Sequence, residues 1–145
     1  FCRQLAEEVL RNAAPLNWLG QVETRVLDGA EVLDLKLHGT AIFVGVARLH
    51  ALALGLPEVN TRRRFEALAR ARGLPERHCE AWVAAFEFLQ MLRLRVQLEG
   101  LAPSGGGNPN LIRLDTLNYI DRRILKESLR VARRLQQRIE LDYMR

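Results

Sequence analysis

The stretch from Pro75 to Gly100, PERHCEAWVAAFEFLQMLRLRVQLEG, decides the class of fold. Apolar residues recur in it every three or four positions, which is the spacing of one face of an α-helix. The residues on that face are Cys79, Trp82, Val83, Phe86 and Leu89. Proline suits the first turn of a helix, and glycine commonly ends one. The stretch therefore predicts one long amphipathic helix.

Further helices are expected on both sides of it. One is capped by Thr40 and runs to Leu54, and the next is capped by Asn60 or Thr61 and ends at Gly73. Asp115 is expected to cap a final helix of about 30 residues, roughly 40 Å long at 1.5 Å per residue. The buried stripe of that helix is Leu117, Ile120, Ile124, Val131, Leu135 and Ile139. Long helices with short connections indicate an antiparallel bundle.

The N-terminal part adds shorter elements. Residues 1–13 have helical spacing, and the Leu and Val residues of 16–26 predict a second short helix. The alternation of 33–38 indicates an extended segment that ends at Gly39. The glycine run of 105–107 lacks the GxxxxGK[ST] pattern, so a loop between helices is the prediction there. The expected fold is all-α, an antiparallel four-helix bundle with one or two extra N-terminal helices.

Composition places the chain among ordinary globular domains, with 145 residues, 48% hydrophobic and 27% charged. Two cysteines without a CxxC spacing indicate reduced thiols and a cytoplasmic protein. The most apolar stretch, 41–54, is interrupted by Arg48 and His50 and is shorter than the roughly 18 residues of a membrane span. No membrane partner is expected. Helical spacing already present at Phe1 predicts a piece of a longer protein.

Catalytic residues are not expected in this chain. Transfer chemistry on phosphates needs closely spaced carboxylates that hold Mg²⁺, and no Asp-x-Asp pair occurs. The histidines lack an HExxH or paired Cys/His spacing, so no metal site is predicted. Cys79 lies on the apolar face, where structural cysteines belong.

Two arginines stand among apolar neighbours. Arg48 interrupts the most apolar helix, and Arg93 lies between two leucines. A charge in such a place is costly unless it is paired or faces a wet cleft. Asp34 and Glu87 are candidate partners. Internal pairing and contact with a ligand are both open for these arginines.

A net charge of +5 favours anionic partners. The last helix carries a basic ridge at four-residue spacing, made of Arg122, Lys126, Arg130, Arg134 and Arg138. Such a ridge either binds phosphate or an acidic partner, or is simply exposed to solvent. We favour the solvent-exposed face. Nucleic acid is therefore not the expected partner.

An ordered set of motifs resembles a known family. The set comprises VLDLK at 32–36, ARLHAL at 47–52, NTRRRF at 60–65, AFEFLQMLRLRVQ at 85–97, NPN at 108–110, LKESL at 125–129 and LQ at 135–136. It is similar to the C-terminal substrate-binding domain of bacterial nucleotidyltransferases that carry cyclic-nucleotide-binding and CBS modules. The segment Asp34–Lys36 is also similar to the adenylyl- and uridylyltransferases of glutamine synthetase and PII, although Leu37-His38-Gly39-Thr40-Ala41 departs from their continuation.

The resemblance implies a division of labour. Residues 1–30 are expected to be a helical connector from an upstream nucleotidyltransferase domain, and 31–145 the substrate-binding bundle. Mg²⁺ and a nucleoside triphosphate are expected for the parent protein, with no cofactor in this chain. The candidate substrate-binding residues are Lys36, Arg48, Asn60, Thr61, Arg64, Arg93, Gln97 and Lys126. For Asn60 and Thr61, a role as helix caps is equally open.

The leading hypothesis is an accessory module that holds the substrate of a nucleotidyltransferase, possessing no catalytic residues itself. Its acceptor is unknown, and a signalling protein is one option. The first alternative is a helical interaction or dimerisation bundle in a signal-transduction protein, with Arg48 and Arg93 neutralised by internal carboxylates. The second is nucleic-acid binding through the basic C-terminal helix.

Overall fold

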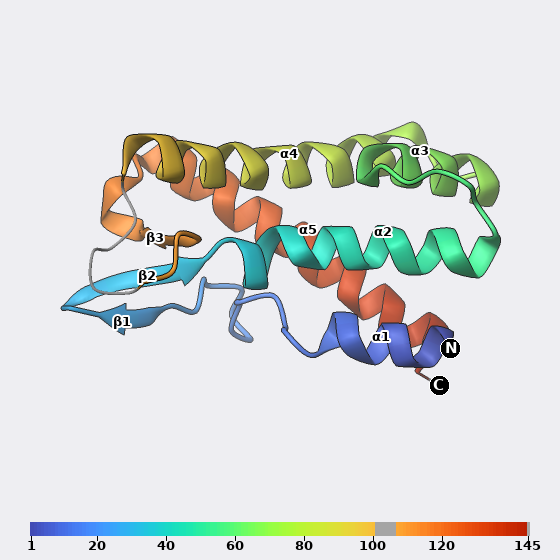
Figure 1. Cartoon of the computed structure of the whole chain (residues 1–145), viewed down its shortest axis with the longest axis horizontal. Coiled ribbons are helices and arrows are strands. Elements are labelled where there is room, and N and C mark those ends of the chain that lie inside the picture. Colours follow the sequence, from blue (N-terminus) through green and yellow to red (C-terminus); the bar gives the residue numbers. More distant parts are fainter. Residues whose placement is uncertain (101–106, 145) are drawn as a thin grey trace.

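The computed structural model describes residues 1–100 and 107–144. Within these ranges, helices form most of the structure and a small antiparallel sheet lies at one end (Figure 1). The helices are α1 (Cys2–Leu10), α2 (Ala41–Leu54), α3 (Thr61–Arg72), α4 (Glu76–Glu99) and α5 (Tyr119–Tyr143). The strands are β1 (Arg25–Leu27), β2 (Ala30–Asp34) and β3 (Leu111–Arg113), in the order β1-β2-β3. A π turn, Lys36–Thr40, joins β2 to α2, and a 3₁₀ turn, Leu114–Thr116, precedes α5.

The predicted boundaries of α2, α3 and α4 are confirmed. Each helix is followed by a glycine with positive φ: Gly55 at 67°, Gly73 at 61° and Gly100 at 63°. These are left-handed C-caps, a conformation that costs glycine little because it has no Cβ. Asn60 caps α3, since its side-chain oxygen accepts from the backbone N–H of Arg63 at 3.2 Å.

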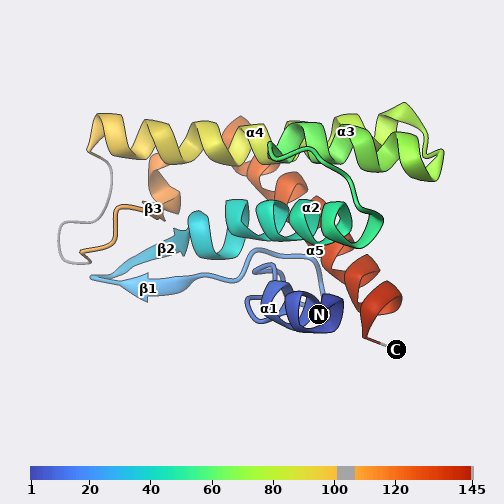
Figure 2. The same ribbon diagram turned by 45° about the vertical axis from the view of Figure 1, so that its right-hand side comes forward.

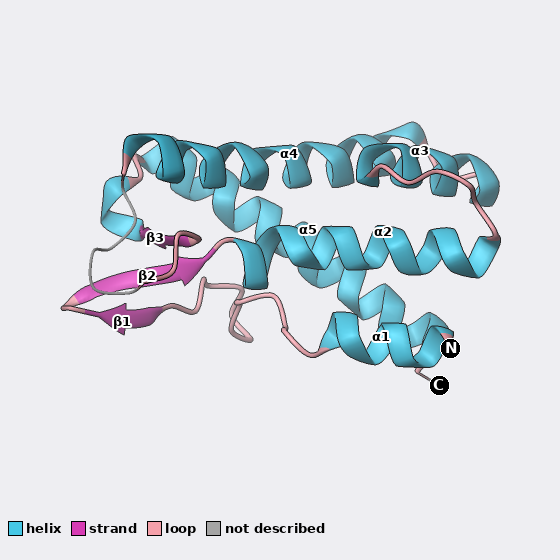
Figure 3. Ribbon diagram, viewed as in Figure 1, coloured by secondary structure: helices cyan, strands magenta, loops and turns pink. Residues whose placement is uncertain are grey.

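The expectation of an all-α fold holds for most of the chain, but a regular antiparallel four-helix bundle is not confirmed. Figures 1 and 2 show α5 crossing α2 and α4 obliquely, whereas α3 and α4 form a close helical hairpin. The first helix, α1, packs against both α2 and α5. Figure 3 shows the three strands gathered at the end of the molecule away from α3.

The predicted second helix over 16–26 is wrong. Asn17 folds this segment into a turn, because its side-chain oxygen accepts from the N–H groups of Leu19 and Gln21, both at 2.9 Å. After it, β1 pairs with β2 through a turn at Asp28 and Gly29, whose φ angles are 51° and 78°. Two successive positive φ values are typical of a tight hairpin turn.

The extended segment predicted over 33–38 ends earlier than expected. One carboxylate oxygen of Asp34 accepts from the N–H groups of Lys36 at 2.9 Å and Leu37 at 2.8 Å, which turns the chain into the π turn. The strand β3, which the sequence did not reveal, pairs with β2. The glycine-loop prediction falls mostly on 101–106, outside the described residues.

The prediction that Asp115 caps the last helix is wrong. Asp115 lies in the 3₁₀ turn, and Asn118 caps α5 by accepting from the N–H of Asp121 at 2.8 Å. Four residues of the predicted stripe are buried, but Ile120 and Ile124 are exposed. The buried positions that the stripe missed include Leu125, Ser128, Leu129, Ala132 and Gln136.

The core is centred on three phenylalanines from three helices. The ring of Phe43 in α2 lies 6.4 Å from that of Phe65 in α3 and 6.0 Å from that of Phe86 in α4, centroid to centroid. All three side chains are buried. Burial of aromatic side chains of this size is among the largest stabilising contributions to a domain.

The helical segment Lys36–Leu54 is longer than the apolar stretch expected from the sequence, because the π turn continues directly into α2. Its most apolar 18-residue stretch has a mean hydropathy of 1.4 even though it includes Arg48. By length and composition the segment could therefore cross a bilayer. Half of this 18-residue stretch is buried inside the protein. Such a length and composition also occur in the core helices of soluble proteins, and α2 packs against α1, α3 and α5.

Candidate ligand cavity

A cavity of about 400 Å³ lies between α1, the π turn, α2 and α4. Three of the predicted binding residues line it from three different elements: Lys36 from the π turn, Arg48 from α2 and Arg93 from α4. The fold therefore brings together cationic side chains that are far apart in the sequence. A volume of this size is in the usual range for small-molecule sites.

The guanidinium of Arg93 is fixed by uncharged acceptors. Its Nε and one terminal nitrogen donate to the side-chain oxygen of Asn110, at 3.3 and 3.1 Å. Its other terminal nitrogen donates to the hydroxyl of Thr40 at 3.0 Å. Within the described residues Arg93 forms no ion pair. Its position is thus held while its charge is not neutralised.

Asn110 is itself held from two sides. Its backbone N–H donates to the side-chain oxygen of Asn108 at 2.9 Å, and its carbonyl accepts from the N–H of Leu35 at 2.9 Å. Asn108 in turn donates to the second carboxylate oxygen of Asp34 at 2.9 Å. Asp34 therefore organises the junction of β2, the π turn and the NPN segment, and it does not pair with Arg48.

Positive charge dominates the lining of the cavity. Arg11 at the end of α1 joins Lys36, Arg48 and Arg93 in the lining. Glu8 is the one carboxylate among the described lining residues. None of the four cations forms an ion pair in the part of the chain that the structure describes. A partly enclosed site with uncompensated cations attracts anions.

Apolar side chains form much of the remaining lining. They are Leu5, Val9, Leu37, Val44 and Leu49. The walls approach closely at Gly45, where a Cβ would lie 2.8 Å from a methyl carbon of Val9. Glycine is therefore required at this contact of α1 with α2.

Comparison with protein families identifies the chain. A family model described as "Putative nucleotidyltransferase substrate binding domain" matches residues 1–143. The chain belongs to this family. No curated protein matches the chain, and no solved structure matches it either. The match includes α1, which supplies one wall of the cavity in this substrate-binding domain.

The other predicted binding residues lie away from the cavity of this domain. Asn60 and Thr61 are at the start of α3, where Asn60 is the cap. Arg64 donates through Nε to the carbonyl of Glu58 at 2.8 Å. Gln97 is exposed on α4 beyond Arg93, and Lys126 is half-buried on α5. These five residues do not line the cavity with Arg93.

The sequence did not single out several residues that now define the site. Thr40 was expected only as a helix cap, but its hydroxyl accepts from Arg93. Asn110 stood in the NPN motif without an assigned role. Nothing in the sequence pointed to Arg11 or Gln90 as cavity residues. An arginine at the end of a helix and an exposed glutamine occur on many surfaces that line no cavity.

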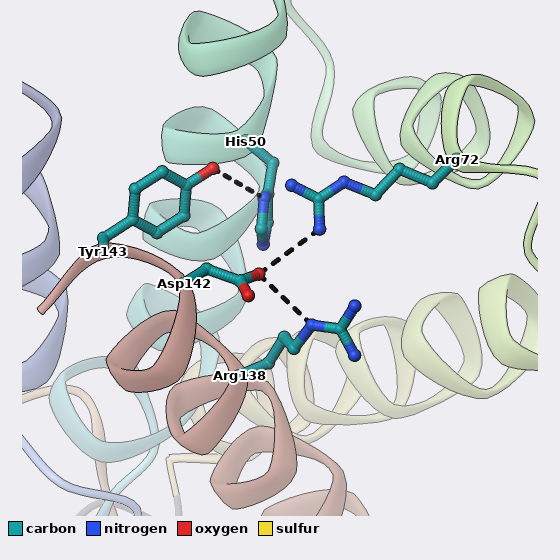
Figure 4. A network of polar contacts seen from close by, with 5 residues as sticks. All are labelled: His50, Arg72, Arg138, Asp142 and Tyr143. Atoms are coloured by element: carbon teal, nitrogen blue, oxygen red, sulfur yellow. Dashed lines mark hydrogen bonds and ion pairs between the residues drawn. The ribbon is translucent and has the colours of Figure 1, made fainter. Parts of the chain in front are cut away.

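A second polar cluster of the domain lies around His50, and Figure 4 shows its five side chains. The Tyr143 hydroxyl lies 3.3 Å from Nδ1 of His50. One carboxylate oxygen of Asp142 lies 3.3 Å from a terminal nitrogen of Arg72 and 3.2 Å from Nε of Arg138. The cluster joins α2, α3 and α5, and none of its members lines the cavity around Arg93.

The charges of this cluster are paired and its histidine is neutral. Burial, and next the positive charge of Arg72, lower the pKa of His50 to about 4, against the opposing effect of Asp142. Burial likewise raises the pKa of the Tyr143 hydroxyl. A cluster in which each charge has a partner within the fold is typical of a structural role.

Metal-ligand residue types and the buried Cys79 offer little further chemistry in the described ranges. No group of three His, Cys, Asp or Glu side chains lies close enough there to hold a metal ion. Cys79 is buried, and burial raises the pKa of its thiol, so thiolate chemistry is disfavoured.

Proposed function

We propose that this chain is the module that holds the substrate of a nucleotidyltransferase, and that the substrate binds in the cavity around Arg93. The observation that carries the proposal is the fixed but uncompensated guanidinium of Arg93 at a cavity shared with Lys36 and Arg48. Membership of the substrate-binding family supports the same assignment.

Catalysis is assigned to another domain of the same protein. The chain has no Asp-x-Asp pair, so the carboxylates that bind Mg²⁺ and the nucleoside triphosphate belong upstream in this proposal. The cavity residues bind and orient an anionic group, which lowers the barrier through positioning and not through bond-making. A Gly-Ser pair followed by Asp-x-Asp ahead of Phe1 is the expected sequence.

The first experiment compares the isolated chain with the longer protein. Each is incubated with Mg²⁺, nucleoside triphosphates labelled at the α-phosphate and an extract of the host cell. The isolated chain is expected to transfer no label, and the longer protein to label an acceptor. Arg93→Glu in the longer protein should reduce the labelling by at least about tenfold, because it reverses the charge that holds the substrate.

Arg77→Glu is the matched control, since Arg77 is exposed on α4 and lies outside the cavity lining. It should retain wild-type labelling. Label transferred by the isolated chain would refute the proposal, and so would wild-type labelling by the Arg93→Glu protein.

Regulation is a further part of the proposal. The resemblance associates this domain with cyclic-nucleotide-binding and CBS modules, and we propose that the parent acts in bacterial signal transduction in the cytoplasm. Labelling by the longer protein should then change when a cyclic nucleotide is added. An unchanged rate at saturating cyclic nucleotide would contradict this part alone.

An interaction bundle is the second candidate, and one observation favours it. Exposed apolar side chains lie along α4 and at the start of α5, namely Met91, Leu94, Leu98, Ile120 and Ile124. The expected neutralisation of Arg48 and Arg93 by carboxylates is absent among the described residues, however. Sedimentation of the wild-type and Leu94→Asp proteins decides between the two candidates. A wild-type dimer that Leu94→Asp dissociates, together with unchanged label transfer in the Arg93→Glu protein, supports the interaction bundle.

Nucleic-acid binding has less support from the geometry. Along the basic ridge of α5, Arg122 donates to the carbonyl of Leu117, and Arg130 and Arg138 pair with Glu127 and Asp142. These internal contacts occupy donors that would otherwise contact phosphates. Binding of an oligonucleotide that weakens steeply with salt and depends on the exposed Arg134 would favour this candidate.

A further inference from the structure

We infer that the cavity takes a phosphorylated ligand, and that Asn110 is the positioning residue that keeps the charge of Arg93 available to it. The inference rests on the proposed function and deepens it by naming the class of substrate. It is carried by three features of the described residues: the number of cations, the donors left on Arg93 and the neutrality of Asn110.

The number of cations favours a multiply charged anion. Arg11, Lys36, Arg48 and Arg93 face one cavity with a single opposing carboxylate, that of Glu8. A carboxylate ligand carries one charge and would leave most of this positive potential uncompensated. A phosphate monoester or a polyphosphate carries two or more charges and several acceptor oxygens, which suits convergent guanidinium and ammonium groups.

Arg93 has donors left for such a ligand. A guanidinium has five N–H groups, and the contacts to Asn110 and Thr40 use one from Nε and one from each terminal nitrogen. One N–H on each terminal nitrogen is therefore free of these protein contacts. Two donors on one planar group match the spacing of two phosphate oxygens.

The neutrality of Asn110 is what distinguishes this site from a structural ion pair. A carboxylate at position 110 would accept from the same two nitrogens and would also cancel the charge of Arg93. The amide oxygen supplies the same geometry without that cancellation. The contacts to Asn108 and Leu35 fix the backbone of Asn110, and its side-chain oxygen then accepts from two nitrogens of Arg93, so that Arg93 is held in advance of ligand binding.

The apolar lining indicates the rest of the ligand. Leu5, Val9 and Leu37 lie beside the cationic groups and offer a surface for an apolar or planar body. The phosphate has two possible sources in a nucleotidyltransferase, the nucleoside triphosphate donor or a phosphorylated acceptor. Both share the chemistry inferred here, and the experiment separates them.

The test measures binding to the isolated chain by calorimetry at low salt. The probes are pyrophosphate, ATP, ribose 5-phosphate and malonate as a dicarboxylate. Pyrophosphate is expected to bind at least about tenfold more tightly than malonate. ATP binding more tightly than pyrophosphate assigns the site to the donor nucleotide, whereas ribose 5-phosphate binding as tightly as ATP assigns it to a phosphorylated acceptor.

Three variants test the role of Asn110. Arg93→Gln should abolish pyrophosphate binding, and Asn110→Asp should weaken it by at least about tenfold because Arg93 is then neutralised. Asn110→Ala should weaken binding less, since the charge of Arg93 stays although its position is released. Asn17→Asp, which adds the same charge on a turn outside the cavity, is the matched control and should stay within about twofold of wild type.

Circular dichroism checks that every variant is folded, and Asn110→Asp keeps the size and shape of the side chain. Wild-type pyrophosphate affinity in the Asn110→Asp protein would overturn the inference, and so would equal binding of pyrophosphate and malonate. An oligonucleotide that binds independently of Arg93, with no binding of the small phosphates, would also overturn it. The proposed function and this inference fail separately. If any of these results is found but the Arg93→Glu parent loses label transfer, the proposed function stands and only the phosphate site is refuted. If the isolated chain transfers label, the proposed function is refuted and the phosphate site stands.

Discussion

Two polar regions lie at opposite ends of α2, and they differ in whether their arginines are paired with a carboxylate. At the N-terminal end, Arg93 is held by Thr40 and Asn110, which are uncharged, beside a cavity. At the C-terminal end, Arg72 and Arg138 share the carboxylate of Asp142 next to the buried His50. The first region leaves the charge of Arg93 uncompensated, and the second neutralises its charges within the fold.

This difference teaches how to tell a binding arginine from a structural one. A half-buried guanidinium that meets a carboxylate has its charge compensated and contributes to stability. One that meets only amides and hydroxyls retains its charge at the cost of weaker internal contacts, which is a stability cost typical of functional sites. Exchanging acid and amide between the two regions is therefore the sharpest test of the comparison.

The largest effect is expected from breaking the contact of α5 with α1, the helix that forms one wall of the cavity, at Gln136. This buried side chain of α5 donates to the carbonyls of Val9 and Asn12 and accepts from the N–H of Ala14, at 3.2, 2.9 and 2.8 Å. Gln136→Leu leaves all three backbone groups without this partner, which should lower the free energy of unfolding by about 3 kcal/mol. Denaturant titration measures the loss.

The neighbour Gln137 is exposed and provides the control. Gln137→Leu should change the free energy of unfolding by no more than about 0.5 kcal/mol. If Gln136→Leu is equally mild, α1 is held to the body of the molecule by apolar packing alone, and the wall of the cavity does not depend on the glutamine.

The next effect is a loss of stability in acid that arises in the His50 region. The folded-state pKa of His50 is lowered to about 4 from 6.5, so the unfolded chain takes up the proton first as the pH falls. The contribution to stability is complete above pH 6.5 and is lost progressively down to about pH 4. At about 1.4 kcal/mol per pKa unit, the loss is about 3 kcal/mol.

His50→Gln isolates this contribution because it removes the titrating ring and keeps a polar partner for Tyr143. The difference in unfolding free energy between wild type and variant should fall by about 3 kcal/mol from pH 7 to pH 4. A difference that stays constant over this range would show that His50 titrates normally in the fold.

A smaller effect is expected from giving the structural region the uncharged acceptor of the cavity. Asp142→Asn removes the carboxylate that Arg72 and Arg138 share and should cost about 1.5 kcal/mol, up to about 1 kcal/mol for each partly exposed pair. It should also lower the pKa of His50 further, because the Asp142 carboxylate opposes the shift. Thermal unfolding at pH 7 measures the cost, with Asp115→Asn in an exposed pair as the control, expected to change stability by about 0.5 kcal/mol or less. Equal effects of the two substitutions would remove the distinction between the regions.

The ends of α2, α3 and α4 could be predicted from residues within or next to each helix. The C-caps of α2, α3 and α4 were predictable because glycine alone takes a left-handed conformation at little cost. The false helix over 16–26 arose because its apolar spacing resembles a helix, whereas the side chain of Asn17 closes a turn. The strand β3 has three residues, too few for alternation to be visible.

The site was predictable only in part, because its contacts are long-range. A charge between leucines pointed to Arg93 from the sequence. Its acceptors could not be found in that way, since Thr40 is 53 residues away and Asn110 is 17 residues away. Arg48 is exposed on α2 and needs no internal partner, which answers the question of pairing that its apolar neighbours raised.

The smallest expected effect is the counterpart of Asp142→Asn, a carboxylate introduced beside the uncompensated Arg93. Asn110→Asp converts the two bonds from Arg93 into an ion pair in a half-buried setting, which should raise the free energy of unfolding by about 1 kcal/mol. For a chain of this length that is a rise in Tm of about 3 °C, measurable by thermal unfolding at low salt and reduced at high salt. The substitution that is expected to weaken phosphate binding is thus also expected to stabilise the fold. A destabilised Asn110→Asp protein would show instead that the amide N–H groups of Asn110 are needed for the fold, and that neutrality at this position does not serve the ligand.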